Sequence, residues 1–228
     1  MKLMSVPPTD PRWPKVLSLS VHEFRTPMTV VAGYIRMLLK DRAGPLSDQQ
    51  RKLLEEAEKS CGRLSALIAE VSELSNLEAG TAPLNKGPVD LTAMLREAVN
   101  TLSPLPDREV PVTLDADSAP APFEADPVRL TQALTSVIAA LRRELVGEEG
   151  LMVRGRTSDG GYEILVGDAG TIAALEQEDA AGRAVFDEWR GGVGLSLVVA
   201  RRVLNAHGAT ILAAPQGAKA GARIVLRP

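Results

Sequence analysis

The feature that most constrains the fold is a long stretch of regularly spaced apolar residues between positions 48 and 79. These residues recur at steps of three and four, at Leu53, Ala57, Cys61, Leu64, Leu67, Ile68, Val71, Leu74 and Leu77. This heptad-like spacing predicts one long helix with an apolar seam. Ser47 lies just before the stretch and is a suitable N-cap for that helix.

A second long helix is predicted from about Trp13 to Asp41, where Ala43-Gly44-Pro45 ends it. One side of this helix is apolar, at Val16, Leu19, Pro27, Val30, Val31, Tyr34, Met37 and Leu38. Two long helices joined by a short turn form a hairpin, and one hairpin alone exposes too much apolar surface. We therefore predict that residues 13–80 form a homodimer through a four-helix bundle. The alternative is a monomeric hairpin packed on the rest of the chain.

After residue 90 the pattern changes to short helices and short strands. Helices are expected at 91–102, 127–145 and 193–206, and strands at 110–114, 121–124, 151–157, 162–167, 210–214 and 223–226. Helices interleaved with mostly antiparallel strands predict a two-layer α/β sandwich over residues 91–228, so the whole chain is of the α+β class. The proline-rich composition of residues 1–12 predicts a disordered lead-in, and that of residues 81–90 predicts a linker.

Composition excludes several classes of function. The 26 Lys and Arg residues and 29 Asp and Glu residues give a net charge of −3, so no general attraction to nucleic acid or anionic membrane is expected. No apolar run approaches the roughly 18 residues of a membrane span, and direct membrane insertion is not expected. The single cysteine, Cys61, excludes an internal disulfide and fits a buried side chain. These features together predict a cytoplasmic protein.

The first predicted helix carries the string His22-Glu23-Phe24-Arg25-Thr26-Pro27. At 100° per residue, His22 lies on the polar side of the helix, and Thr26 follows one turn later. A neutral imidazole nitrogen is a nucleophile, an adjacent carboxylate can orient the ring and take its proton, and a nearby hydroxyl can place a water molecule. Pro27 lacks the amide that would bond to the Glu23 carbonyl, so the helix should bend just past His22. A lone histidine would indicate only a solvated surface residue.

This string resembles the phosphoacceptor motif, or H-box, of the two-component sensor histidine kinases. The resemblance implies that His22 is the phosphoacceptor, that Glu23 is its acid–base partner, and that Thr26 helps to dephosphorylate a partner response regulator. It also implies that residues 13–80 form the dimerisation and histidine phosphotransfer domain. Family members usually carry a sensor domain before the H-box. The short segment before His22 therefore predicts either an excised core or a protein that takes its input from a separate sensor chain.

The second half of the chain resembles the ATP-binding domain of the same kinases. Asp168 and Gly170 match the first glycine box, whose carboxylate accepts from the adenine amino group. Gly192, Gly194 and Leu195 match the second glycine box, where backbone amides before a helix cradle phosphates. The resemblance therefore implies that these five residues bind ATP. His207-Gly208 falls where the family has a structural His-Gly pair.

The metal-binding part of that resemblance is incomplete. Two family asparagines on the helix after Asp126 correspond to Ser136 and Ala140, and the second asparagine normally holds Mg²⁺. A methyl group cannot ligate Mg²⁺, which needs oxygen donors. A family lysine appears as Arg143, and Glu144 is a possible but weak substitute ligand. ATP binding and Mg²⁺ binding are both doubtful on this pattern, and no metal ligands are assigned.

The lid region departs from the family pattern as well. Ile172 replaces the second glycine of the first box, and a β-branched residue does not adopt positive φ easily. Residues 171–190 are shorter than the usual ATP lid, and Val185-Phe186-Asp187-Glu188-Trp189 resembles a remnant of its aromatic motif. Lid closure and its phosphate contacts are therefore in doubt.

Three functions remain open. The favoured hypothesis is a two-component protein that exchanges a phosphoryl group between His22 and a response-regulator aspartate, with weak or absent ATP-driven autophosphorylation. A regulator phosphatase activity that uses Thr26 belongs to the same hypothesis. The first alternative is a fully active ATP-dependent kinase core. The second is a pseudokinase scaffold that binds a regulator without chemistry.

Overall fold

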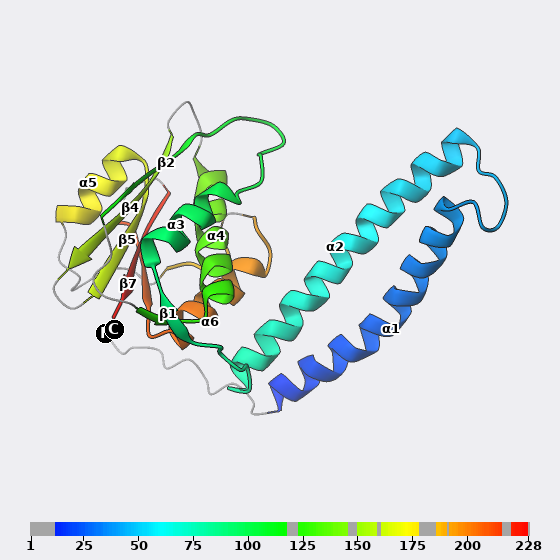
Figure 1. The fold of residues 1–228 in the computed structure, drawn as a ribbon, viewed down its shortest axis with the longest axis horizontal. Helices are drawn as coiled ribbons and strands as arrows, with labels where there is room; N and C mark the ends of the chain where they lie inside the picture. The colour runs from blue at the N-terminus through cyan, green and yellow to red at the C-terminus, as the bar shows by residue number, and fades with distance from the viewer. Residues whose placement is uncertain are drawn as a thin grey trace, which may run out of the picture. The chain divides into compact units, whose positions relative to one another are not determined.

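The structure, a computed structural model, describes residues 12–117, 123–145, 150–158, 161–177, 186–190, 192–215 and 220–227. The chain divides into two compact units, Met1–Ala82 and Pro83–Pro228 (Figure 1). The first unit is a helical hairpin and the second is a mixed α/β domain, as predicted. The predicted lead-in lies outside the described residues, apart from residue 12.

The hairpin consists of α1 (Trp13–Leu39) and α2 (Asp48–Glu78). Ser47 caps α2 as predicted, because its hydroxyl accepts from the Gln50 amide and the Gln50 side chain accepts from the Ser47 amide. Helix α1 ends two residues before the predicted Asp41, which has a φ of 55°. Arg51 fixes this turn, since it donates to both carboxylate oxygens of Asp41 and to the Leu39 carbonyl at 2.8–2.9 Å.

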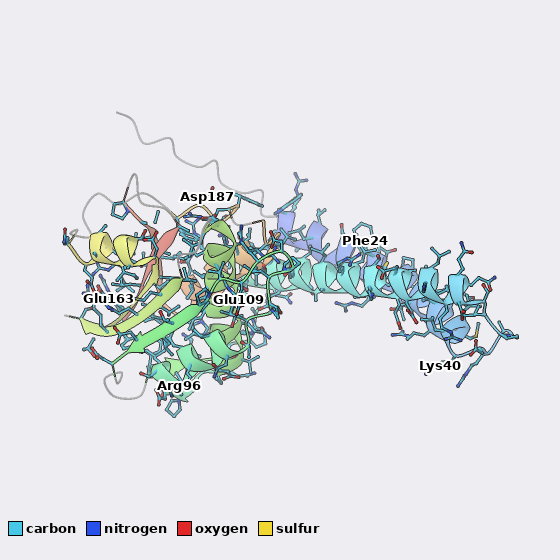
Figure 2. The ribbon with its side chains drawn as sticks, turned by 90° about the horizontal axis from the view of Figure 1, so that it is seen from above. Phe24, Lys40, Arg96, Glu109, Glu163 and Asp187 are labelled. Carbon is cyan, nitrogen blue, oxygen red and sulfur yellow. The ribbon has the colours of Figure 1, made fainter. Side chains whose placement is uncertain are left out.

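Helix α1 has two apolar sides. Val21 and Ile35 are buried on the side that packs against α2. The other apolar side is the one that the sequence pattern identifies, and its large residues stay 40–64 % exposed: Val16, Leu19, Val30, Val31, Tyr34 and Met37. Phe24 is also exposed (Figure 2). The helix is therefore apolar well beyond the surface that the hairpin itself covers.

The predicted apolar seam of α2 also has a buried part and an exposed part. Cys61 is buried, as expected, and Ser75 is buried where its hydroxyl donates to the Pro14 carbonyl at 2.7 Å. Leu53, Leu64 and Leu67 are instead 43–66 % exposed. The nine regularly spaced residues thus do not form one buried seam within a single hairpin.

The α/β unit is built on a five-stranded sheet with the order β2-β4-β5-β7-β6. The bounds of these strands are β2 Val112–Ala116, β4 Leu151–Ser158, β5 Gly161–Gly167, β6 Thr210–Ala213 and β7 Gly221–Leu226. Strands β2 and β4 are parallel, and the other pairs are antiparallel. A separate antiparallel pair joins β1 (Gly87–Val89) to β3 (Phe123–Ala125). Part of the predicted linker is therefore a strand.

Three helices lie on one side of the five-stranded sheet: α3 (Leu91–Asn100), α4 (Pro127–Glu144) and α6 (Ser196–Ala206) (Figure 1). Asp126 caps α4 as predicted, because its carboxylate accepts from the Arg129 amide at 3.1 Å. Proline follows the cap, where its missing amide costs no hydrogen bond. The buried side of α4 forms much of the core of this unit.

A fourth helix, α5 (Ala169–Gln177), lies on the other side of the sheet (Figure 1) and was not predicted. Ile172 packs with Leu165 and Leu175 in a small cluster. Thr171 lies so close to the sheet that a Cβ at Gly167 or Gly221 would come within 2.8 or 2.3 Å of its methyl carbon. Both positions therefore require glycine while Thr171 is present.

Candidate phosphotransfer and nucleotide sites

His22 and Glu23 lie on the open surface of α1. Their side chains are 79 % and 72 % exposed, and His22 Nδ1 is 3.7 Å from Glu23 Oε1. This separation is longer than a hydrogen bond but allows one after a small side-chain rotation. The structure therefore brings together the predicted imidazole and its predicted acid–base partner. It also leaves the second ring nitrogen, Nε2, open to an incoming group.

Thr26 is exposed one turn after His22. The neighbouring Ser20 and Thr29 hydroxyls both donate to the carbonyl four residues earlier, at 2.9 and 2.8 Å. Within the described residues, the structure gives no such bond to the Thr26 hydroxyl, which thus stays available for a ligand or a water molecule. Helix α1 continues through Pro27, and its two halves run in different directions in Figure 1, which fits the predicted bend.

The second glycine segment leads directly into α6. Gly192 and Gly194 have φ values of 59° and 67°, which side-chain-bearing residues rarely adopt. Leu195 is the N-cap residue of α6 and makes no side-chain cap. An open cavity of about 360 Å³ adjoins this segment. It is lined by Thr101, Leu102, Ser103, Pro104, Leu105, Thr135, Ser136, Ala139, Arg142, Arg143, Gly192, Val193 and Ser196.

Asp168 and Gly170, the predicted adenine-binding residues, are not among the residues that line this cavity. The Asp168 side chain is buried and its Oδ1 accepts from the Thr171 amide at 2.7 Å. The Ile172 amide also donates to the Asp168 carbonyl. Asp168 thus caps α5, and Gly170 lies in the first turn of that helix. The start of the predicted lid is therefore a helix packed on the sheet, in which Ile172 needs no positive φ.

The α4 positions that correspond to the two family asparagines carry side chains that are apolar or already hydrogen-bonded. Ala140 is fully buried in α4 and has no donor atom. The Ser136 hydroxyl donates to the Gln132 carbonyl at 3.0 Å. Glu144 accepts from Arg190 Nε at 2.8 and 3.0 Å, so its carboxylate is already paired. Within the described part of the chain, no three His, Cys, Asp or Glu residues gather where they could hold a metal ion.

The predicted remnant of the lid is held in place by a buried side chain and by ion pairs. Its first residue, Val185, lies outside the described residues. Phe186 is buried, and the Arg190 guanidinium lies 5.5 Å from the centre of its ring. Glu188 accepts from Arg201 and Arg202 of α6 at 2.8 and 3.1 Å. Trp189, whose amide donates to Asp187 Oδ1 at 3.0 Å, remains 70 % exposed (Asp187 is labelled in Figure 2). These contacts hold the segment to α4 and α6.

His207 is structural, as the sequence pattern predicts. Its Nε2 accepts from the Asp126 amide at 3.0 Å, and its Nδ1 lies 2.8 Å from the Val203 carbonyl, to which it donates. Burial lowers the pKa of His207. Burial also acts to raise the pKa of Asp126, but bonds from the Arg129 and Asn85 amides outweigh it and lower that pKa overall. The pair joins the start of α4 to the end of α6.

Residues 15–80 match the family of His Kinase A (phospho-acceptor) domains. Over most of its length the chain is also similar to sensor histidine kinases. The chain belongs to the two-component sensor histidine kinase family.

Among its relatives in this family is the signal transduction histidine-protein kinase BarA of Escherichia coli, which is 31 % identical over 83 % of this chain and 22 % of BarA. The circadian input-output histidine kinase CikA of Synechococcus elongatus is 29 % identical over 86 % of this chain and 27 % of CikA. The sensor histidine kinase ZraS of E. coli is 29 % identical over 87 % of this chain and 42 % of ZraS. The chain thus spans less than half the length of these relatives.

Two solved structures share the fold. The full-length ShkA structure in complex with AMPPNP gives a TM-score of 0.72 at 24 % identity, covering 94 % of this chain and 46 % of ShkA. The histidine kinase AdeS of Acinetobacter baumannii gives 0.58 at 20 % identity, covering 90 % of this chain and 97 % of AdeS. No helix among the described residues is both long enough and apolar enough to cross a membrane.

Sequence reasoning about this histidine kinase family member missed two groups of residues. The first is the pairing of Glu144 with Arg190, for which two oppositely charged residues 46 positions apart give no local signal. The second is Arg142, which lines the cavity and donates to the carbonyls of Val110 and Ser103. Its position one residue before Arg143 could have drawn attention to it.

Proposed function

We propose that His22 accepts a phosphoryl group from a response-regulator aspartate and returns it, and that ATP-driven autophosphorylation is weak or absent. The single observation that supports this proposal is that the motif side chains are exposed on α1 but hydrogen-bonded within the fold in the α/β unit. His22, Glu23 and Thr26 are exposed on α1. The side chains at the nucleotide and metal positions of the α/β unit make their hydrogen bonds within the fold instead.

The geometry of His22 supports a simple transfer step. Nε2 of the neutral ring attacks the phosphorus of the aspartyl phosphate, the N–P bond forms, and the acyl O–P bond breaks to release the aspartate carboxylate. Glu23 lies beside Nδ1, where it can orient the ring and take the Nδ1 proton as positive charge develops. The reverse sequence returns the phosphoryl group to a regulator.

The Thr26 hydroxyl supports a second reaction of the same site. A hydroxyl that is not bonded to its own helix can hold a water molecule against the regulator's aspartyl phosphate. Attack by that water on phosphorus releases inorganic phosphate and restores the regulator carboxylate. We therefore include regulator dephosphorylation in the proposed function, with Thr26 as the residue that positions the water.

The partners follow from the surface of the hairpin. The apolar side of α1 and the exposed leucines of α2 fit a second copy of the same hairpin, which would cover them in a four-helix bundle. The polar side around His22 would then face a response-regulator receiver domain.

An ATP-dependent kinase is the second candidate. The glycine conformations before α6 favour it, and the related ShkA was crystallised with AMPPNP. The missing Mg²⁺ ligands oppose it, because developing phosphoryl charge would lack its main stabiliser. A scaffold without chemistry would have no physical need for Glu23 and Thr26 beside His22.

The experiment that tests the proposal begins with a phosphorylated response regulator and the full chain. Wild type should remove the phosphoryl group from the regulator and carry it on His22, seen as an acid-labile label, and His22→Ala should carry none. Binding of ATP is measured in parallel by calorimetry with and without Mg²⁺. Magnesium-dependent micromolar binding followed by labelling of His22 from ATP would favour the kinase. Equal regulator binding by wild type and His22→Ala, with no transfer, would favour the scaffold.

A further inference from the structure

One edge of the five-stranded sheet lies next to a second cavity. Strand β2 comes first in the order β2-β4-β5-β7-β6, so among the described residues it pairs with β4 alone. A cavity of about 310 Å³, which we call the β2 groove, lies between this strand and α3. It is lined by Arg96, Val99 and Asn100 of α3 and by Val112, Leu114 and Ala116 of β2. The groove therefore adjoins a sheet edge that could accept another strand.

The pairing of β2 with β4 fixes which backbone groups of β2 face outward. The Leu151 amide donates to the Pro111 carbonyl, and the Asp117 amide donates to the Gly155 carbonyl, both at 2.9 Å. Along a strand, alternate residues bond to the same neighbour. Positions 111, 113, 115 and 117 therefore face β4, and the amides and carbonyls of positions 112, 114 and 116 face away from it. Among the described residues, no group bonds to these outward amides and carbonyls.

The side chains of the same three β2 residues lie on the α3 side of the sheet. Ala116 is in register with Gly155, and a Cβ at Gly155 would lie 3.1 Å from the side chain of Leu95 in α3. Since residues at every second position share a face, Val112 and Leu114 lie on that side as well. All three remain partly exposed. The groove thus combines unpaired backbone groups with uncovered apolar side chains, which is the composition of a strand-addition site.

Arg96 gives the β2 groove a positive charge. Its side chain is exposed and has no ion pair or hydrogen bond among the described residues (Arg96 is labelled in Figure 2). None of the residues that line the groove is a carboxylate. Asp115 of β2 lies on the other side of the sheet, where it accepts from Arg154 Nε at 3.0 Å. An acidic side chain on an incoming segment would therefore meet the Arg96 guanidinium beside the strand edge.

We propose that the β2 groove binds an extended acidic peptide segment of a partner protein as an additional strand of the sheet. The outward backbone groups of Val112, Leu114 and Ala116 bond to the segment, and Arg96 pairs with its carboxylate. This inference goes beyond the proposed function and does not depend on phosphotransfer by His22.

Titration of the full chain with synthetic peptides tests the proposal. The probe is a capped peptide of about eight residues, the length of an ordinary strand, which alternates valine and threonine around a central glutamate. It should bind at least tenfold more tightly than the same peptide with a central lysine, because only the carboxylate can pair with Arg96. Equal binding of the two peptides, or no binding of the glutamate peptide at millimolar concentration, would overturn the proposal.

Methylation of the peptide backbone tests whether binding uses the sheet edge. Two further glutamate peptides carry N-methyl groups on one or the other set of alternate amides. Only one set faces β2 in an added strand, so one methylated peptide should lose binding and the other should keep it. Retention of binding by both methylated peptides would show that the backbone does not pair, and would overturn the proposal.

Amide hydrogen exchange on the full chain locates the bound peptide. The amides of Val112, Leu114 and Ala116 should exchange rapidly in the free chain and at least tenfold more slowly with saturating glutamate peptide. Those of Thr113 and Asp115, which face β4, should be slow throughout. Unchanged exchange at the three outward amides would overturn the proposal. Slow exchange there without peptide, increasing with protein concentration, would mean that a second copy of the chain occupies the edge, and would also overturn it.

Variants separate this groove from general charge attraction. Arg96→Gln should weaken binding of the glutamate peptide by about tenfold, because a charged hydrogen-bond donor is lost, and Arg96→Lys should retain part of the affinity. Ala116→Pro removes one outward amide without removing a bond to β4, and should weaken binding about fivefold. The matched control is Arg143→Gln, which removes an exposed arginine of α4 at the other cavity. Equal weakening by Arg96→Gln and Arg143→Gln, or none by Arg96→Gln, would overturn the proposal. Thermal melting checks that each variant is folded.

Discussion

The hairpin carries the phosphoacceptor part of the family pattern, and the α/β unit carries the nucleotide part. The motif side chains are exposed on the hairpin, whereas those of the α/β unit are hydrogen-bonded within the fold. On α1, His22 and Glu23 are more than 70 % exposed and point into solvent. In the α/β unit, Asp168 caps a helix and Glu144 pairs with Arg190. The two histidines show the same contrast, since His207 bonds on both ring nitrogens inside the fold. A motif residue is available for chemistry only when the fold does not use its polar atoms.

The largest expected effect is on the hairpin side of this contrast. Glu23→Gln should slow phosphoryl transfer from a regulator by about 10²–10⁴-fold, because general acid–base help is lost. Helix content should not change, since the side chain is exposed. Rapid-quench transfer assays measure the rate, and Glu55→Gln, at an exposed glutamate of α2, is the control. A Glu23→Gln rate within threefold of wild type would mean that Glu23 has no catalytic role.

The second prediction concerns the exposed apolar side of α1. Tyr34→Glu should weaken dimer formation by about 100-fold or more, because an unpaired carboxylate would be buried between hairpins. Sedimentation equilibrium over a range of concentrations measures the dissociation constant. Thr29→Glu adds the same charge to the polar side of the helix and should have little effect. A Tyr34→Glu protein that dimerises as wild type does would show that this side of α1 is not the interface.

The third prediction tests how closely the α/β unit is packed where the family has asparagine. Ala140→Asn should lower the free energy of unfolding by about 1–3 kcal/mol, because the fully buried site has no room for an amide. Ser136→Asn, at the cavity wall, should cost less than 1 kcal/mol. Urea unfolding measures both. Equal stability of the two variants would show that α4 accepts an asparagine at either position.

The smallest expected effect is the pH dependence that His207 gives to the α/β unit. Because burial lowers its pKa in the folded state, the unfolded chain binds more protons once the pH falls below about 6.5. Stability should therefore decrease as the pH falls from 7 towards 5, by at most about 1.4 kcal/mol per pH unit. Urea unfolding at several pH values measures this slope. His207→Gln should flatten it, and His22→Gln, in the other unit, should leave it unchanged.

The elements of the fold followed from spacing and end signals. Helix α2 and its Ser47 cap lie where the sequence places them, as do α4, its Asp126 cap and the β4–β5 hairpin. Cap residues and alternating apolar residues act within a few positions of each other, so a single sequence shows them. The pattern identified the exposed apolar side of α1 but not the side with Val21 and Ile35, which packs against α2.

The candidate site was predictable in its residue types but not in their partners. The string from His22 to Pro27 is local, and the exposure of His22 follows from its place on the polar side of the helix. Asp168 and Glu144 acquire their roles from Thr171 and Arg190, and the second partner lies 46 residues away. Helix α5 was missed because its sequence was assigned to a lid. The order of motif residues therefore indicates ancestry more reliably than it indicates what each residue binds.

The close approach of α5 to the sheet has a consequence for how this sequence can change over time. Thr171 leaves no room for a side chain at Gly167 or Gly221, although the two glycines lie on different strands. Substitutions at these positions are consequently order-dependent: a larger residue at either glycine is tolerated only after Thr171 has become smaller. In an alignment of descendants, the three positions should vary together. A lineage that keeps Thr171 should therefore also keep glycine at both positions.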